Sequence, residues 1–346
     1  MLFNKNGTGS LEFKALIGFI YKSINFDNLK SYVGFAERDL KKIIGKEVFQ
    51  VAQDHYDSEN YLLETPDEDH PEYPVLDELV AKIQYPLAVH TYRKYVPSSD
   101  LTHGDKGRQI FVSEQEKPAF EWQVEKDNEN LLRLANEATD LLIEFLDDHI
   151  DDEIILDPVE GTTEYVIPWG TSAAYLASRE LFINTVDEFQ KIFMIGGSRL
   201  VFISLVPFMR RVQDNEIKAC FTAEKYAELC EDIKDGDFSA ENAIILDKAR
   251  QPLALLTMSV AVKRLTSEVL PDGIFSNLTT SVVKSKMPAS KIDRNEVSAS
   301  LEKDGLRELR KLQDHLAKLE AAAAGTTVEA VDFTERIDAT EKFVRL

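Results

Sequence analysis

Apolar side chains recur at steps of three and four residues through much of the chain, which is the spacing of one face of an α-helix. Near the start of the chain the recurring positions are Leu29, Val33, Ala36, Leu40 and Ile43. This pattern predicts a mainly α fold, in which each helix turns one apolar face toward a core.

Two longer stripes of apolar residues lie further along the chain. The first belongs to a helix predicted from about residue 117 to 148 and consists of Leu134, Ala138, Leu141 and Phe145. The second consists of Leu306, Leu309, Leu312, Leu316 and Leu319. Both are too short for the sustained heptads of a free coiled coil, so we expect each stripe to pack within its own unit.

The sequence also repeats itself. The segment SYVGFAERDL from Ser31 resembles SLVPFMRRVQ from Ser204, an offset of 173 residues. The segment PLAVHT from Pro86 matches PLALLT from Pro252 at four of six positions, an offset of 166. Amphipathic helices reuse the same letters, but two matching blocks in the same order favour an internal duplication over chance.

We therefore expect two tandem, diverged helical-bundle units, each with a small β-hairpin insertion. The predicted boundaries are 1–150 for the first unit, 151–180 for a β-prone connecting segment, 181–320 for the second unit and 321–346 for a C-terminal tail. Each unit is interpreted as helix, helix, short β segment and long helix. The β-prone runs are Gln109–Val112 and Thr279–Val283.

Some local features can be assigned from residue type. Ser31 and Ser204 occupy positions where an N-cap would stabilise a helix, which would place Pro207 in a first turn. Pro86 and Pro252 are interpreted either as first-turn prolines or as kinks.

Charge limits the classes of function. The chain has 61 acidic and 40 basic residues, a net charge of −21, and its basic residues are scattered. Such a chain repels nucleic acid, so we expect no specific DNA binding. The longest apolar stretch, from Leu200 to Phe208, is far below the roughly 20 residues of a membrane span.

Two further features bear on the compartment. The only cysteines are Cys220 and Cys230, which favours synthesis in a reducing compartment. The first residues lack the pattern of a secretory signal, because Glu12 and Lys14 interrupt the apolar run.

We find no motif for catalysis, metal or cofactor in the sequence, and therefore predict that the protein is not an enzyme. The six histidines lack zinc-site or protease spacing. His90 is matched by Leu256 in the second copy, which indicates a packing position and not a ligand. The acidic residues Asp147, Asp148, Asp151, Asp152 and Glu153 lack the order of a calcium loop. A solvated helix end is the preferred interpretation of that cluster, and contact with a basic partner is the alternative.

The run SLVPFMRRVQDNEI, then KYAELCEDI, then PLALLTMSVAVKRL resembles the small helical head–tail adaptor (connector) proteins of tailed phages. More closely, INFDNLKSYVGFAERDLKKIIGKEVF, EKPAFEWQVEKDNENLLRLANEATDLLIEFLDDH and FINTVDEFQKIFMIGGSRLVFISLVPFMRRVQ resemble a family of uncharacterised proteins encoded beside capsid genes in phages and prophages of Bacteroidota. The second resemblance covers most of the chain up to about Glu320.

The resemblance implies a structural protein of the virion neck, made in the host cytoplasm. Adaptors of this kind form a homo-oligomeric ring, usually of twelve subunits, between the portal protein and tail or neck proteins, and DNA passes through the ring without specific binding. The resemblance implies no cofactor, no metal and no membrane contact. A tail-completion or minor capsid protein, or an assembly chaperone, is the alternative.

Ring subunits often hold neighbours through hairpins and extended tails. The candidate interface residues are accordingly those of the predicted hairpins, the connecting segment and the tail. They are Gly107, Phe111, Gly273, Phe275, Tyr165, Trp169, Phe333 and Phe343.

Overall fold

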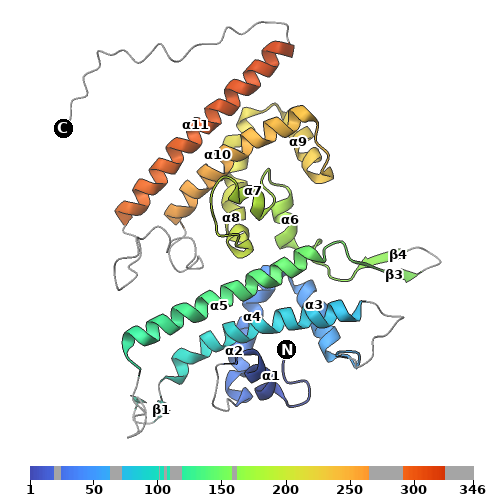
Figure 1. Cartoon of the computed structure of the whole chain (residues 1–346), viewed down its shortest axis with the longest axis vertical. Coiled ribbons are helices and arrows are strands. Elements are labelled where there is room, and N and C mark those ends of the chain that lie inside the picture. The colour runs from blue at the N-terminus through green and yellow to red at the C-terminus, as the bar shows by residue number, and fades with distance from the viewer. Residues whose placement is uncertain are drawn as a thin grey trace.

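The computed structural model describes residues 1–18, 25–62, 72–100, 102–104, 107–109, 119–157, 162–264 and 291–323 of the chain. Two helical units follow one another along the sequence, blue to green and then yellow to red in Figure 1. The fold is mainly α, in two tandem units, as the sequence predicts. Among the described residues no helix is long and apolar enough to cross a membrane.

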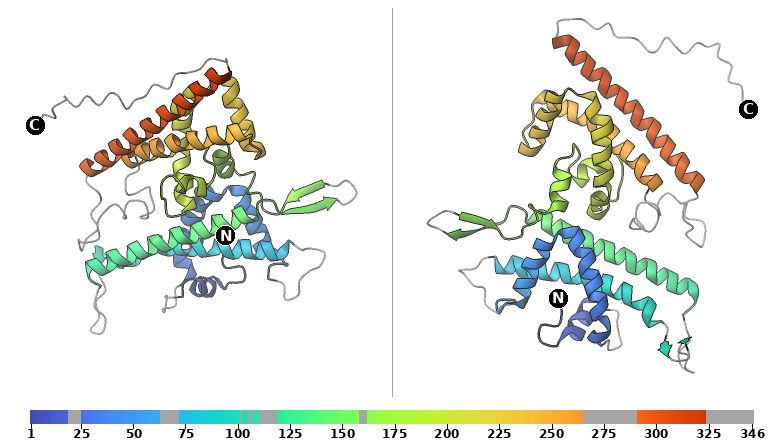
Figure 2. Two further views of the ribbon diagram at one scale, coloured as in Figure 1. Left: turned by 45° about the horizontal axis from the view of Figure 1, so that its top comes forward. Right: turned by 180° about the vertical axis from the view of Figure 1, so that it is seen from behind.

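Two long helices, α4 and α5, form the centre of the first unit and lie side by side in every view (Figures 1 and 2). Its elements are α1 Gly9–Leu16, α2 Phe26–Ile44, α3 Lys46–Asp57, α4 Tyr73–Ser99, β1 Thr102–Gly104, β2 Gly107–Gln109 and α5 Glu121–Asp148.

The second unit repeats this order, with α11 lying along α10. Its elements are α7 Val186–Gln190, α8 Arg199–Val212, a π-helical turn Gln213–Ile217, a 3-10 turn Lys218–Cys220, α9 Ala223–Asp235, α10 Ala240–Arg264 and α11 Lys291–Ala323. Between the units lie β3 Glu153–Asp157, β4 Thr162–Tyr165 and α6 Ala173–Arg179. Strands β3 and β4 pair antiparallel and project away from both units (Figures 1 and 2).

Each unit has its own core. The first buried cluster runs from Leu2 to Trp169 and the second from Leu181 to Leu312. Trp169 therefore belongs to the first core, although it lies in the connecting segment. Leu200 and Ile203 of α8 pack against the first core, so the two units are in contact.

The duplication found in the sequence holds in three dimensions for the first matched block. When the two copies are aligned at the offset of 173 residues, every buried residue of α2 from Leu29 onward corresponds to a buried residue of α8 or of the π-helical turn. The pairs are Leu29 and Phe202, Val33 and Val206, Ala36 and Met209, Leu40 and Gln213, and Ile44 and Ile217. Both helices thus present the same face to their cores.

The second offset also holds, and it extends into the final helices. Pro86 and Pro252 are both buried inside long helices, α4 and α10. At the same offset of 166 residues, Ile143 and Leu146 of α5 meet Leu309 and Leu312 of α11, and all four are buried. Equivalent positions can therefore be named within α4 and α10 and within α5 and α11.

Several local predictions are wrong. Ser31 and Ser204 lie inside α2 and α8, whose N-caps are Asn25 and Ser198, six residues earlier in each case. Each true N-cap side chain accepts a hydrogen bond from the first turn. Pro207 is consequently an interior residue of α8 and not a first-turn proline.

Each unit also contains a helix that the sequence pattern did not separate from its neighbours. In the first unit this helix is α3, which starts directly after Gly45 ends α2 at a φ of 92°. In the second unit the corresponding helix is α9, which ends at Gly236 in the left-handed conformation. Glycine permits both turns because it has no Cβ to clash at positive φ.

The predicted stripes of the final helices are only partly correct. Leu141 is 52% exposed and Leu306 is 41% exposed, so neither belongs to a core. The buried face of α5 is formed by Leu131, Ala135, Ala138, Thr139, Leu142, Ile143, Phe145 and Leu146. The expectation that both helices pack within their own unit agrees with their contacts along α4 and α10.

Candidate interface sites

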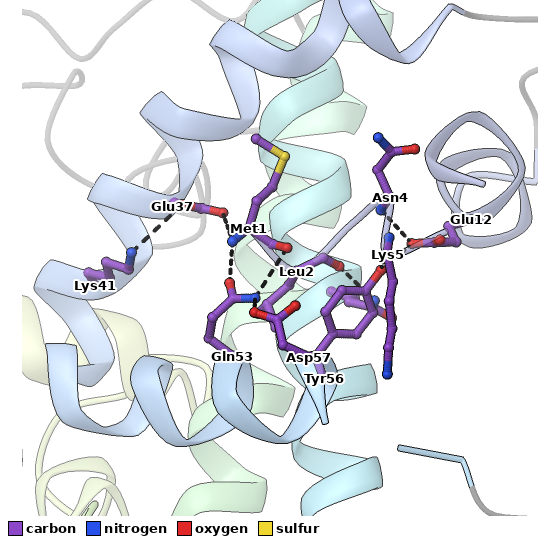
Figure 3. A network of polar contacts seen from close by, with 11 residues as sticks. Met1, Leu2, Asn4, Lys5, Glu12, Glu37, Lys41, Gln53, Tyr56 and Asp57 are labelled. Atoms are coloured by element: carbon purple, nitrogen blue, oxygen red, sulfur yellow. Dashed lines mark hydrogen bonds and ion pairs between the residues drawn. The ribbon is translucent and has the colours of Figure 1, made fainter. Parts of the chain in front are cut away.

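The first residues of the chain form a short extended segment, residues 1–5, held against α1, α3 and α4 (Figure 3). Leu2 and Phe3 are buried in the first core, and the Leu2 carbonyl accepts a hydrogen bond of 2.7 Å from Nε2 of Gln84. The backbone N–H of Asn4 donates to Oε2 of Glu12 at 3.1 Å, and the same carboxylate oxygen accepts a hydrogen bond of 2.9 Å from the Tyr56 hydroxyl. Burial and this neighbouring carboxylate raise the pKa of Tyr56.

The second unit holds a segment in the same way. Phe182 and Ile183 are buried, and the Phe182 carbonyl accepts from Nε of Arg250 at 2.7 Å. Arg250 is the residue 166 positions after Gln84. The Asn184 amide donates to Oε2 of Glu188 at 3.2 Å, as Asn4 does to Glu12. The duplication therefore begins at the first residues of each unit, well before the blocks visible in the sequence.

The contact between the units is centred on Asp140 of α5. Its carboxylate accepts the backbone N–H of Leu200 at 2.7 Å, in the first turn of α8. Asp140 thus supplies an acceptor for one of the N–H groups that the first turn of a helix leaves without an intrahelical partner. Burial raises the pKa of Asp140, and hydrogen bonds from Leu200, Ser198 and Arg199 oppose that rise.

Asp147, about two turns further along α5, ties three parts of the chain together. Its Oδ1 accepts the indole N–H of Trp169 at 2.8 Å, and its Oδ2 lies 3.2 Å from Nε of Arg199. Arg199 also lies 3.7 Å from Glu144. Part of the acidic run at the end of α5 is therefore used within the chain to position α8 and the connecting segment.

A pocket of about 230 Å³ lies beside this contact, between the end of α5, α6 and the start of α8. Tyr175 lines it with its ring tilted against that of Trp169, the two centroids 5.8 Å apart, and with the guanidinium of Arg179 4.4 Å from its own centroid. The pocket is also lined by Arg199, whose charge is already balanced by Asp147. The mixed charges and partly paired groups leave no convergent set for a defined ligand.

The structure separates the predicted interface residues. Gly107 pairs with Gly104 in the short β1–β2 sheet, and Tyr165 pairs with Glu153 at the base of the β3–β4 hairpin. Trp169 is only 2% exposed, so its side chain is not available to a neighbouring subunit and the prediction of a contact through it is wrong. Phe111, Gly273, Phe275, Phe333 and Phe343 lie outside the described residues. So does the β-prone run Thr279–Val283.

Other exposed apolar side chains were missed. Phe120 and Trp122 are 69% and 61% exposed where α5 begins, and Met194 is 81% exposed in the turn before α8. A signal existed for the first pair: two aromatic residues stand among charged ones in the run AFEWQVEKD, which lacks helical apolar spacing.

Two histidines of the first unit, His55 and His90, have polar partners within the chain. His55 lies 2.8 Å from Asp77, whose carboxylate also accepts the Leu62 N–H. Burial lowers the pKa of His90 to about 4. Within the described ranges no three histidine, cysteine or acidic side chains lie close enough to hold a metal ion.

These observations define a class: a helical protein made of two copies of one unit in fixed contact. The chain belongs to a family of unknown function, DUF6712, which matches residues 40–153 and 217–322. The two matched regions fall one in each unit. No curated protein and no solved structure matches the chain.

Proposed function

We propose that the protein is a structural subunit of a phage virion, a head–tail adaptor that joins the portal to the tail and surrounds the DNA channel. One observation carries this proposal most directly: two equivalent helical units are fixed to one another by the Asp140 and Asp147 contacts on α8. A block of this kind suits a load-bearing part of an assembly, because its two bodies keep one relative orientation.

The projecting elements support the same proposal. The β3–β4 hairpin extends from the junction beyond both units (Figure 2), and β1–β2 lies at the other end of α4. Exposed strand edges offer unpaired backbone groups to another chain, so such hairpins suit contact with neighbouring subunits.

The net charge of −21 suits a channel through which DNA moves. Like charges repel over the screening distance of about 10 Å, so an acidic wall would not retain the duplex.

The proposal is tested by imaging the purified protein alone and with the portal protein, using mass photometry and negative-stain microscopy. We expect a closed ring, or a ring that forms on the portal. Mass spectrometry of purified virions should find the protein in mature particles. If the protein stays monomeric and does not bind the portal protein, the proposal is wrong. If the protein is absent from mature virions, an assembly chaperone is favoured.

A further inference from the structure

The middle of the outward face of α11, between Glu296 and Asp314, is basic in a chain that is strongly acidic overall. Lys303, Arg307 and Arg310 follow one another at steps of four and three residues, and all three are exposed. The opposite side of the helix carries Leu309 and Leu312, which are buried against α10. The three basic residues therefore form one stripe that points away from the second unit.

The equivalent face of α5 has the opposite charge. At the offset of 166 residues, Lys303 corresponds to Glu137, Arg307 to Leu141 and Arg310 to Glu144. All three residues of α5 are exposed, and Leu141 is 52% exposed between the two carboxylates. The buried residues Ile143 and Leu146 remain apolar as Leu309 and Leu312, whereas Glu137 and Glu144 are replaced by the basic residues Lys303 and Arg310.

The charges of these two faces are only weakly balanced inside the chain. Lys303 and Arg310 form no ion pair with the described residues, and Arg307 reaches only Asp304, at 3.4 Å on its own helix. On α5, Glu137 lies 3.5 Å from Arg133, and Glu144 lies 3.7 Å from Arg199 of α8 with about half of its side chain exposed. Exposed pairs of this kind contribute little and are easily exchanged for others.

We propose that the outward face of α11 in one copy of the protein docks on the outward face of α5 in another copy. The guanidinium groups of Arg307 and Arg310 would pair with the carboxylates of Glu137 and Glu144, and Leu141 would pack against the apolar stems of the arginines. The contact joins two different surfaces, so repetition produces a ring or a filament and not a closed dimer. This inference names the subunit interface of the proposed ring and rests on that function.

A basic helical stripe can also bind the phosphates of nucleic acid. The stripe on α11 continues into Asp314, which an extended phosphate contact would disfavour, and the chain as a whole repels polyanions. An acidic face at the equivalent position of the other unit is the complement present in every copy. A second copy is therefore the favoured partner.

The test uses two charge-reversed variants of the full chain, Arg307→Glu with Arg310→Glu, and Glu137→Lys with Glu144→Lys. We expect each variant alone to lose self-association at least tenfold in mass photometry. Mixing the two should restore it, because the acidic α11 of one variant then faces the basic α5 of the other. The matched control for the α11 variant, Lys30→Glu with Lys234→Glu, makes the same change in net charge at exposed positions elsewhere and should assemble as the unchanged protein does.

Circular dichroism checks that each variant is folded, and the mixing result separates a lost contact from a lost fold. If both variants still form the ring, the inference is overturned and the adaptor proposal stands. If the unchanged protein never self-associates but binds portal, the inference is again overturned. Fluorescence anisotropy with a DNA duplex supplies the remaining outcome: duplex binding that the α11 reversal abolishes, with assembly intact, would assign this face to nucleic acid.

Discussion

Leu256 of α10 lies directly over Gly305 of α11. A Cβ on Gly305 would stand 2.7 Å from both Cγ and Cδ2 of Leu256, which is shorter than a non-bonded contact between carbon atoms. The residues at the equivalent positions of the first unit are His90 and Thr139, and they are also in contact, with Nε2 and Oγ1 3.2 Å apart. One pair of helix positions thus touches in both units. A leucine over glycine fills it in one unit and a hydrogen-bonded polar pair fills it in the other.

The substitution Gly305→Ala should separate α10 from α11. We expect a loss of about 1–3 kcal/mol in the free energy of unfolding, because the added methyl group overpacks a closed contact. Leu256→Ala is itself destabilising because Leu256 is buried, but in that background Gly305→Ala should cost less, since the group with which the methyl collides is gone. Urea unfolding followed by circular dichroism measures both effects.

Gly34→Ala is the matched control for this prediction. Gly34 is also inside a helix, α2, but a Cβ there meets nothing within 4 Å. The change should therefore stabilise the protein by up to about 1 kcal/mol through helix propensity alone. Equal effects at Gly305 and Gly34 would contradict the close approach of α10 and α11.

Much of the fold could be predicted from the sequence, because both copies of the unit retain the helical spacing of their buried apolar residues. The spacing of Leu29, Val33, Ala36 and Leu40 identifies the buried face of α2 correctly. The block at Pro86 and Pro252 marks equivalent helices correctly. The predicted helix starts at Ser31 and Ser204 were wrong. The similarity of these two serines shows that their positions correspond in the two units, but it does not show that a helix begins there. An N-cap requires a non-helical backbone, which both Asn25 and Ser198 have.

Less of the candidate sites could be predicted. The capping of α8 by Asp140 joins residues 60 positions apart, and no local pattern announces such a contact. The buried Trp169 donates its indole N–H to Asp147, which the sequence shows only as one acid in a run of acids. The opposite charges of α5 and α11 could have been predicted from the sequence, since the offset of 166 residues aligns Glu137 with Lys303. Only the structure shows that both side chains point outward.

His90 should make stability depend on pH. Its pKa in the folded protein is lowered to about 4, whereas an unfolded histidine titrates near 6.5. Between these values the unfolded chain binds more protons than the folded chain, so stability falls as the pH falls from about 6.5 toward 4. Thermal unfolding across this range should show the decline, and His90→Leu, the residue of the second unit, should reduce it. A folded-state pKa near 6.5 for His90 by NMR would contradict the prediction.

Asp140 should matter to the junction through its oxygen more than through its charge. Asp140→Ala removes the acceptor for the Leu200 N–H and should cost about 1 kcal/mol. Asp140→Asn keeps an acceptor and should cost less, because burial raises the pKa of this carboxyl and so already disfavours its ionised form. Urea unfolding compares the two, with Asp148→Asn as an exposed control on the same helix. Equal losses for Asn and Ala would show that the charge itself holds α8.

The two extended segments should be released separately. Gln84 and Arg250 hold equivalent carbonyls, those of Leu2 and Phe182. Gln84→Ala should increase amide hydrogen exchange in the residues around Phe3 and leave the second unit unchanged, and Arg250→Ala should do the reverse around Ile183. The arginine should have the larger effect, because its guanidinium also pairs with Glu188 at 2.6 Å, whereas Gln84 carries no charge. Exchange that rises in both units for either change would show that the units do not open independently, and that the α5–α8 junction couples their stability.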